Sequence, residues 1–440
     1  MNNKKWMAIL LGGIMAASLA APCSVSAAEK TTLTFWHAMG GTNGEVLQQI
    51  VDDFNASQDE IEIKAEYQGT YDDTITKLKA AMRSDSGLPD VCQMYDVGTK
   101  FMYDSGAVIP VEDKFESTGY DKSSVMEVIS SYYTVDGKQY AMPFNVSTPM
   151  LYYNKDVFEA AGLDPETPPT TYDEVLEDAK KIVESGAAPV GYSQAIYGWF
   201  FEQQLAGLGV TYGNNDNGRK EAVTAVDFDS NGGGLKVFDM WKKLYDSGYF
   251  EDYGTTTADT QTAFFSGQVG MIIESTAILK NAVDSSPFEV GTGYLPRIEQ
   301  NDEGGVIIGG GSLWLTDTGN EANEDAAWKF IEYITTPDVQ AKWSMGTGYF
   351  AINEKAYETE DMKAYLKENP NFETAINQLK DSPVNCNTAG VLSGVQTEAR
   401  LTFNEIMPQV YDGKLTTQDA VDQLAASVNK AIENYNESIK

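Results

Sequence analysis

The N-terminal part of the chain changes repeatedly between the apolar period of a strand and that of a helix. Strands are predicted at 31–37 and 60–67, where apolar and polar residues alternate, and a buried strand is predicted around 89–95. Helical spacing of apolar residues predicts helices at 42–54 and 71–84. This β-α-β-α-β order predicts a parallel, doubly wound sheet, whose ligands lie beyond the carboxyl ends of the strands.

A second set of elements begins near Ser147, without a long flexible linker before it. Helices are predicted at 156–161, at 323–335 and from 417 onward. Apolar runs predict further strands at 150–153, 288–294, 306–308 and 313–315. Because 440 residues exceed what one hydrophobic core usually holds, we expect two lobes. Several short crossings between the lobes would provide a hinge and a cleft.

The first 28 residues have the organisation of an export signal. Two lysines precede an apolar stretch at 6–21, which is too short to span a membrane comfortably, and Ser26-Ala27-Ala28 offers a cleavage site of small residues. We therefore expect a secreted protein, in the periplasm or at the outer face of the cell membrane. Lipid attachment at Cys23 is not expected, because Pro22 stands where that route needs a small residue.

The charge balance and the scarcity of metal ligands restrict the function. The chain holds 65 acidic residues against 31 Lys and Arg, a formal net charge of −34. Nucleic acids and anionic membrane surfaces recruit basic residues, so neither is expected as a partner. The single histidine, His37, excludes zinc sites built from histidine pairs, and no metal or cofactor is expected. Cys92 and Cys386 form no disulfide framework and are expected to be small buried apolar residues.

Two other chemical readings concern acids and glycines. Counting does not decide against a secreted hydrolase with a carboxylate pair, because 65 acids guarantee accidental pairs. The run Gly309-Gly310-Gly311-Ser312 lacks the lysine and spacing of a phosphate-binding P-loop, so it is either a turn or a close approach of the backbone to another group. By themselves, the residues predict a hinged, acidic, secreted binder of unknown ligand.

Several segments carry a resemblance to a known family. They are FWHAMGG at 35–41, PFNVSTPMLYYNKDVFEAAGLDPETPP at 143–169, IIGGGSLW at 307–314, TGY at 347–349 and EAR at 398–400. These segments resemble the extracellular solute-binding proteins of carbohydrate ABC importers (family 1). Within this class the chain is similar to the binders of sn-glycerol 3-phosphate, from about Thr31 to the C-terminus.

The resemblance implies the fold, the partners and the absence of catalysis. The implied fold is a class II periplasmic-binding-protein-like α/β fold, with two doubly wound lobes joined by a multi-crossing hinge. Its N-terminal lobe would comprise 29–140 and 290–338, and its C-terminal lobe 141–289 and 339–440. Such a protein is not an enzyme. It would act as a monomer that delivers its solute to the permease subunits of an ABC transporter.

Eight positions match the family's ligand-binding residues. By this resemblance, the phosphate group lies against Arg400, Ser275, Gly310 and Tyr349, and the glycerol end against Asp96, Tyr71, Ser147 and Trp199. A phosphate favours a planar guanidinium together with neutral donors. A glycerol end favours an acceptor for its hydroxyl protons and an apolar wall. Each set supplies the groups that its part of the ligand needs.

The chain departs from the family at two of the implied ligand positions. Asp96 stands where the family has Glu, and Ile196 stands where it has a second Trp, which could admit a larger headgroup such as a glycerophosphodiester. A neutral sugar or oligosaccharide is the alternative ligand. Arg400 could instead pair with Glu398 or Glu405 at the surface. Trp199 and Tyr349 could be core aromatics, and the two serines could be turn or cap residues.

Overall fold

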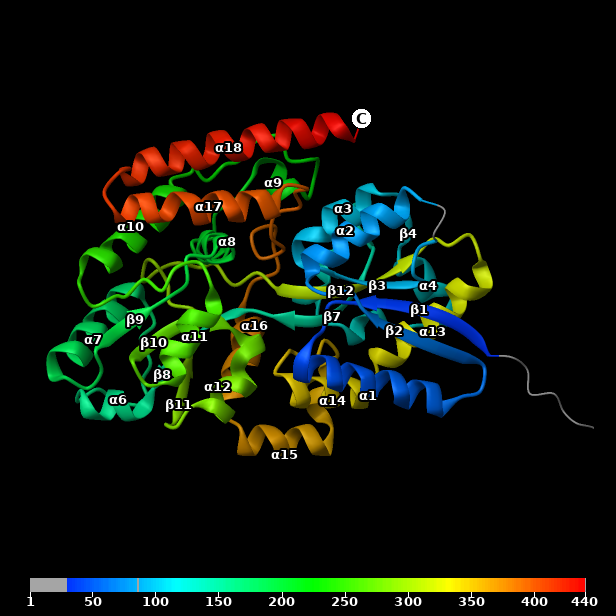
Figure 1. The fold of residues 1–440 in the computed structure, drawn as a ribbon, viewed down its shortest axis with the longest axis horizontal. Coiled ribbons are helices and arrows are strands. Elements are labelled where there is room, and N and C mark those ends of the chain that lie inside the picture. The colour runs from blue at the N-terminus through cyan, green and yellow to red at the C-terminus, as the bar shows by residue number, and fades with distance from the viewer. Residues whose placement is uncertain (1–29, 85–86, 440) are drawn as a thin grey trace, which may run out of the picture.

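The computed structural model describes residues 30–84 and 87–439, which form two lobes side by side, each built on its own sheet (Figure 1). The sheet of the first lobe has the order β2-β1-β3-β12-β4, and β7 also pairs with β12. Its strands are β1 (Thr31–His37), β2 (Ile61–Tyr67), β3 (Val91–Tyr95), β4 (Val108–Ile109), β7 (Met142–Ser147) and β12 (Gly309–Thr316). The first three are parallel, as the sequence predicts, and β12 is antiparallel to its neighbours.

The sheet of the second lobe is mixed. Its order is β11-β8-β10-β9, with β8 antiparallel to both neighbours and β9 parallel to β10. The strands are β8 (Pro149–Asn154), β9 (Val190–Ser193), β10 (Val269–Ser275) and β11 (Val290–Gly293), and a separate small hairpin is formed by β5 (Thr134–Val135) and β6 (Lys138–Gln139). The predicted two-lobed α/β fold is therefore confirmed, although each sheet contains an antiparallel strand and neither is a purely parallel, doubly wound sheet.

Helices surround both sheets (Figure 1). The first lobe carries α1 (Gly41–Ser57), α2 (Tyr71–Met82), α3 (Thr99–Asp104), α4 (Glu112–Thr118), α5 (Glu127–Ser130), α13 (Glu321–Ile334) and α14 (Pro337–Thr347). The second lobe carries α6 (Lys155–Ala160), α7 (Tyr172–Ser185), α8 (Gly198–Gly207), α9 (Asn214–Gly218), α10 (Gly233–Asp246), α11 (Thr257–Phe265), α12 (Leu279–Ser285), α16 (Asn371–Asp381), α17 (Gln396–Tyr411) and α18 (Thr417–Ser438). The short helix α15 (Glu360–Glu368) connects α14 to α16.

Two apolar clusters form the core, and the first of them continues from the first lobe onto one face of the second sheet, where it includes Tyr152 and Ile272. In β1, alternation buries Leu33 and Phe35 against helices of the first lobe, as the period of two predicts. In the second lobe, Leu424 and Val428 of α18 pack towards Phe403 of α17, on the helical face that the sequence predicts. Burying each such side chain stabilises the fold by about 1.5–3 kcal/mol relative to leaving it exposed.

The chain crosses between the lobes where β7 passes into β8 and again between β11 and β12. The side-chain amide of Gln378 bonds both crossings. The Nε2 of Gln378, in α16, donates to the carbonyl oxygen of Pro149 at 2.7 Å, where β7 passes into β8. Its Oε1 accepts from the backbone nitrogen of Leu295 at 2.5 Å, at the start of the crossing from β11 to β12. Ser382 Oγ holds this second crossing near its end, through the backbone nitrogen of Val306 at 3.1 Å. Hydrogen bonds from α16 and from Ser382 therefore hold the two crossings of the hinge together.

Sheet membership corrects the predicted lobe boundaries. The strand β7 belongs to the first sheet and β11 to the second, although the predicted boundaries at 140/141 and 289/290 assign each to the other lobe. Helix α14 packs on α1, so the boundary at 338/339 would cut through a helix of the first lobe. We therefore propose boundaries near 148, within 294–308 and after α14. Strand pairing is a long-range contact, which local hydrophobic pattern does not reveal.

The glycine run begins β12, which is the last strand of the first sheet along the chain but lies between β3 and β4. Residues 306–308, predicted as a strand, lie outside regular structure, and β12 begins at Gly309.

Cys92 and Cys386 are both free thiols, and of these two only Cys92 is fully buried. In the described ranges, no helix is both long and apolar enough to cross a membrane. The predicted export signal, with Cys23, lies outside those ranges.

Candidate ligand-binding site

The site is organised by two helices of the second lobe that touch backbone to backbone. At Gly198, in the first turn of α8, an added β-carbon would lie 2.5 Å from Cα of Arg400 in α17, so only glycine allows this approach. The amide of Gly198 donates to Oδ1 of Asn404 at 2.9 Å. Glu202 lies one turn after Gly198 on the same helix face, and therefore opposite Arg400.

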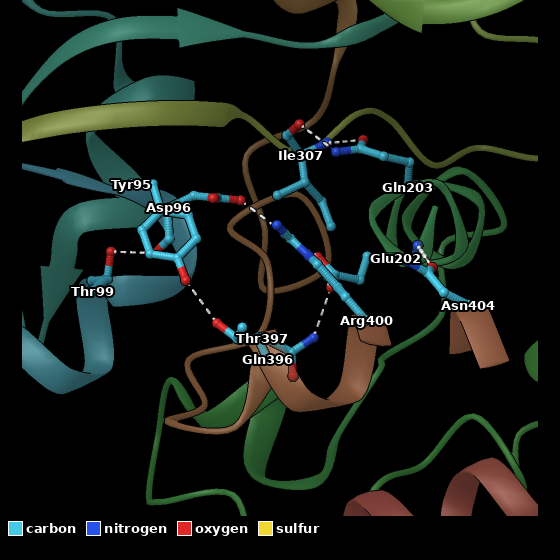
Figure 2. Close-up of polar contacts among 11 residues, drawn as sticks. Tyr95, Asp96, Thr99, Glu202, Gln203, Ile307, Gln396, Thr397, Arg400 and Asn404 are labelled. Carbon is cyan, nitrogen blue, oxygen red and sulfur yellow. Dashed lines mark hydrogen bonds and ion pairs between the residues drawn. The ribbon is translucent and has the colours of Figure 1, made fainter. Parts of the chain in front are cut away.

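Glu202 grips one edge of the Arg400 guanidinium. Its Oε1 accepts from Nε at 2.8 Å, and its Oε2 accepts from Nη2 at 2.7 Å. Gln396, one turn before Arg400, donates from Nε2 to the same Oε1 at 2.9 Å. The bidentate geometry fixes the plane of the guanidinium. The network is shown in Figure 2.

The other lobe contributes an acid to the same cation. Asp96 follows β3, and its Oδ2 accepts from Nη2 of Arg400 at 2.8 Å. One residue earlier, Tyr95 OH and Thr397 Oγ1 are 2.8 Å apart, so two consecutive residues of the first lobe contact α17 (Figure 2). Only 5% of Asp96 and 8% of Arg400 are exposed. The carboxyl end of a first-lobe strand thus meets the second lobe where the fold predicts a ligand site.

Electrostatics at this junction keep the cation charged. Burial disfavours the charged guanidinium, but Asp96 and Glu202 outweigh this effect and raise the pKa of Arg400 well above its ordinary value. Burial also raises the pKa of Glu202, against the opposing effect of Arg400. Tyr197 borders the cation, with its ring centroid 6.0 Å from Cζ of Arg400.

A second group of polar residues comes from the first lobe. The ring of Tyr71 stacks on Tyr95, with 5.2 Å between centroids. The phenol oxygen of Tyr71 accepts from Nδ2 of Asn145 at 2.7 Å, and Oδ1 of Asn145 accepts from Gln93 at 2.7 Å. Burial raises the pKa values of Tyr71 and Tyr349, so both phenols stay neutral donors. Asn145 thus orients Tyr71 beside the end of β3.

The glycine run lets the backbone approach its neighbours closely. Gly310 has a φ of +93°, and a β-carbon there would lie 1.8 Å from the carbonyl oxygen of Asn145. At Gly309, a β-carbon would lie 2.7 Å from Cζ2 of Trp199. The indole Nε1 of Trp199 is buried and has no hydrogen-bond partner among the described residues. The indole nitrogens of Trp314 and Trp343 also lack a partner among the described residues, so the feature specific to Trp199 is its close approach to Gly309.

The structure brings most of the predicted site residues together. Ser147 is buried at the end of β7, opposite Gly309. Tyr349 is buried and stacks on Trp343, with ring centroids 5.7 Å apart. Ser275 differs, because its Oγ accepts from the backbone nitrogen of Ala277 at 3.2 Å and caps a turn. Among the described residues, no hydrogen bond joins Ser275 to Arg400.

One alternative from the sequence is wrong, and three participants were missed. Arg400 does not pair with Glu398 or Glu405 at the surface, because Glu202 and Asp96 hold it in the interior. Glu202, Gln396 and Asn145 are not among the site residues predicted from the sequence. Glu202 left a signal, since it is an acid inside the aromatic helical run GWFFEQQL and therefore needs a buried partner.

Comparison with known proteins gives the family. The model of the family described as "Bacterial extracellular solute-binding protein" matches residues 49–374. The chain belongs to this family. The family binds solutes and is not enzymatic, so the predicted absence of catalysis agrees with it. Its members act as the solute-binding components of ABC importers.

The proteins similar to this chain bind ligands of two kinds. The sn-glycerol-3-phosphate-binding periplasmic protein UgpB of Escherichia coli K12 is 31% identical over 417 residues, which cover 93% of this chain and 94% of that protein. The structure of the cyclic α-maltosyl-1,6-maltose binding protein of Arthrobacter globiformis is 26% identical, with a TM-score of 0.76 and coverage of 92% and 100%. UgpB of Mycobacterium tuberculosis in complex with glycerophosphocholine is 20% identical, with a TM-score of 0.78 and coverage of 92% and 99%.

Proposed function

We propose that this solute-binding protein captures sn-glycerol 3-phosphate, or a glycerophosphodiester, between its lobes. The observation that carries the proposal is the buried guanidinium of Arg400 at the junction of the lobes, with Nη1 making no hydrogen bond to any described residue. Two N–H groups of Nη1 are therefore free to bind an anion, and bonds to an anion from a buried guanidinium are strong.

Neutral groups around Arg400 suit the rest of such a ligand. Tyr71 and Tyr349 supply neutral phenols beside Asn145. Trp199 offers an apolar face and an unpartnered indole N–H. The 31% identity to UgpB of E. coli, which spans nearly the whole of both chains, supports the same ligand class.

Calorimetry with matched variants tests this proposal. We expect Arg400→Ala to lower the affinity for sn-glycerol 3-phosphate by roughly 30- to 700-fold, since removing a buried partner of an anion costs roughly 2–4 kcal/mol. Arg83→Ala removes the same side chain from an exposed position of the first lobe and should leave the affinity unchanged. Circular dichroism would verify that both variants are folded. An equal affinity of Arg400→Ala and the unaltered protein would exclude the anion from this site.

A neutral sugar is the second candidate, and the Arthrobacter structure at 26% identity favours it. Titration of maltose and related oligosaccharides against the same two variants separates the candidates. A sugar that binds tightly and is insensitive to Arg400→Ala would replace the phosphate ester as the ligand.

The predicted export signal and the family membership bear on the cellular role. We propose that residues 1–28 direct export, that the mature protein acts as a monomer in the periplasm or at the outer face of the membrane, and that it delivers its solute to permease subunits. Native mass spectrometry of protein purified from its source would measure the mature N-terminus, the oligomeric state and the mass of any bound solute.

A further inference from the structure

The carboxylate of Asp96 occupies an edge of Arg400 that an anionic ligand would need. A guanidinium presents two edges for bidentate bonds, one formed by Nε and Nη2 and one by Nη1 and Nη2. Glu202 takes the first edge with both of its oxygens. Asp96 takes half of the second edge, through the remaining hydrogen of Nη2, while Nη1 has no bond among the described residues.

The hydrogen bonds at Nη2 of Arg400 show which bond a ligand must replace. Nη2 has two hydrogens, and both are used, one by Glu202 at 2.7 Å and one by Asp96 at 2.8 Å. A phosphoryl group can therefore bind Arg400 in bidentate fashion only by displacing one of these acids. Glu202 is held by two bonds to Arg400 and one from Gln396, whereas Asp96 has a single bond to Arg400. Asp96 is the acid that is easier to displace.

We propose that Asp96 is an internal competitor for the ligand's anion and thereby a specificity-determining residue. Its carboxylate fills the anion position from the opposite lobe, and a solute must offer two well-placed anionic oxygens to replace it. A neutral hydroxyl cannot compensate for the lost ion pair, because it carries no charge to replace that of the displaced carboxylate. Asp96 therefore selects against polyols. This inference rests on the proposed function.

The surroundings hold Asp96 in the competing position. Tyr95 bonds Thr397 across the lobes, one residue before Asp96 and three before Arg400. The carbonyl oxygen of Asp96 accepts from Thr99 Oγ1 at 2.7 Å, which fixes the turn that follows β3. Its second carboxylate oxygen makes no hydrogen bond within residues 30–84 and 87–439. The backbone is therefore restrained, while the side chain gives up only one bond when it rotates away.

Methyl phosphate is the informative probe, because it has the anion but no hydroxyl that Asp96 could accept from. We expect Asp96→Asn, which keeps the shape and removes the charge, to bind methyl phosphate about tenfold more tightly than the unaltered protein, because a neutral amide oxygen accepts from Nη2 more weakly than the carboxylate does. Asp59→Asn makes the same change in net charge at an exposed position of the first lobe and should not alter binding. Binding is measured by calorimetry, and folding by the thermal midpoint.

The outcomes separate this inference from the proposed function. Tighter binding by Asp96→Asn alone supports the competitor role. An unchanged or weaker affinity, while sn-glycerol 3-phosphate still binds in an Arg400-dependent manner, overturns the competitor role and leaves the proposed function intact. If neither phosphate ester binds the unaltered protein or Asp96→Asn, the proposed function fails and the inference fails with it.

Discussion

Two arginines lie at contacts between the lobes, Arg400 buried and Arg219 partly buried, and their partners differ in kind. Arg400 is bonded to the carboxylates of Glu202 and Asp96. Among the described residues, Arg219, which follows α9, is hydrogen-bonded only to backbone carbonyl oxygens, among them those of Tyr132 at 2.9 Å in the first lobe and Gly390 at 3.0 Å. One cation is neutralised by acids and the other is solvated by dipoles.

The difference appears in the pKa values of the two side chains. Burial lowers the pKa of Arg219 to about 10, because no carboxylate compensates for the loss of water. Asp96 and Glu202 overcome burial at Arg400 and raise its pKa. Carbonyl groups are fixed in the backbone, so Arg219 can only lock the packing of the lobes. Carboxylates are mobile side chains, so Arg400 can exchange one anion for another. The comparison is consistent with the binding role proposed for Arg400 and with a structural role for Arg219.

The largest expected change in stability comes from removing the ion-paired arginine. Arg400→Met leaves two buried acids without a cation, and the free energy of unfolding should fall by about 3–5 kcal/mol. Urea denaturation at pH 7 measures this loss. Because burial already raises the pKa of Glu202, removing Arg400 should raise it further, and the deficit should shrink as the pH falls towards 5. A deficit that grows on acidification would contradict this account.

Removing the carbonyl-bonded arginine should cost less. Arg219→Met leaves carbonyl groups unsatisfied and no buried acid, so we expect a loss of about 2–3 kcal/mol in the same urea experiment. That loss should be nearly independent of pH between 5 and 8, because no carboxylate bonds Arg219. The affinity for the solute should fall much less than in Arg400→Ala. A pH-dependent loss, or an equal loss of affinity, would remove the distinction between the two arginines.

The smallest expected effect concerns His37, a third basic side chain, which burial keeps neutral. Burial lowers the pKa of His37 from 6.5 to about 4. Between these values the unfolded chain binds more protons than the folded one, so stability is complete above pH 6.5 and is lost as the pH falls through about 4. We expect His37→Asn, which keeps an acceptor for the backbone nitrogen of Met39, to remove about 1–2 kcal/mol of this acid sensitivity. Thermal midpoints at pH 7 and pH 4.5 provide the measurement, and equal acid sensitivity in both proteins would contradict the assignment.

The candidate site could be predicted in part. Arg400, Asp96, Trp199 and Gly310 were identified from a family resemblance, and the structure brings them to one junction. Glu202 was missed because the family motifs do not mark it. Its pairing with Arg400 depends on the close approach of α8 and α17 at Gly198. These two helices are far apart in the sequence. The resemblance also implied that Asp96 holds the glycerol end, and its bond to Arg400 gives it a different contact here.

The sequence alone determined the fold class and the first elements of the chain. Alternation and helical spacing are local properties, and they were sufficient for β1, β2 and β3 and for the helices between them. Only the tertiary structure decided which sheet β7 and β11 join, and which acids surround Arg400. These facts depend on contacts between residues distant in the chain, whose energies come from strand pairing and buried charge. No periodic pattern within a single segment records them.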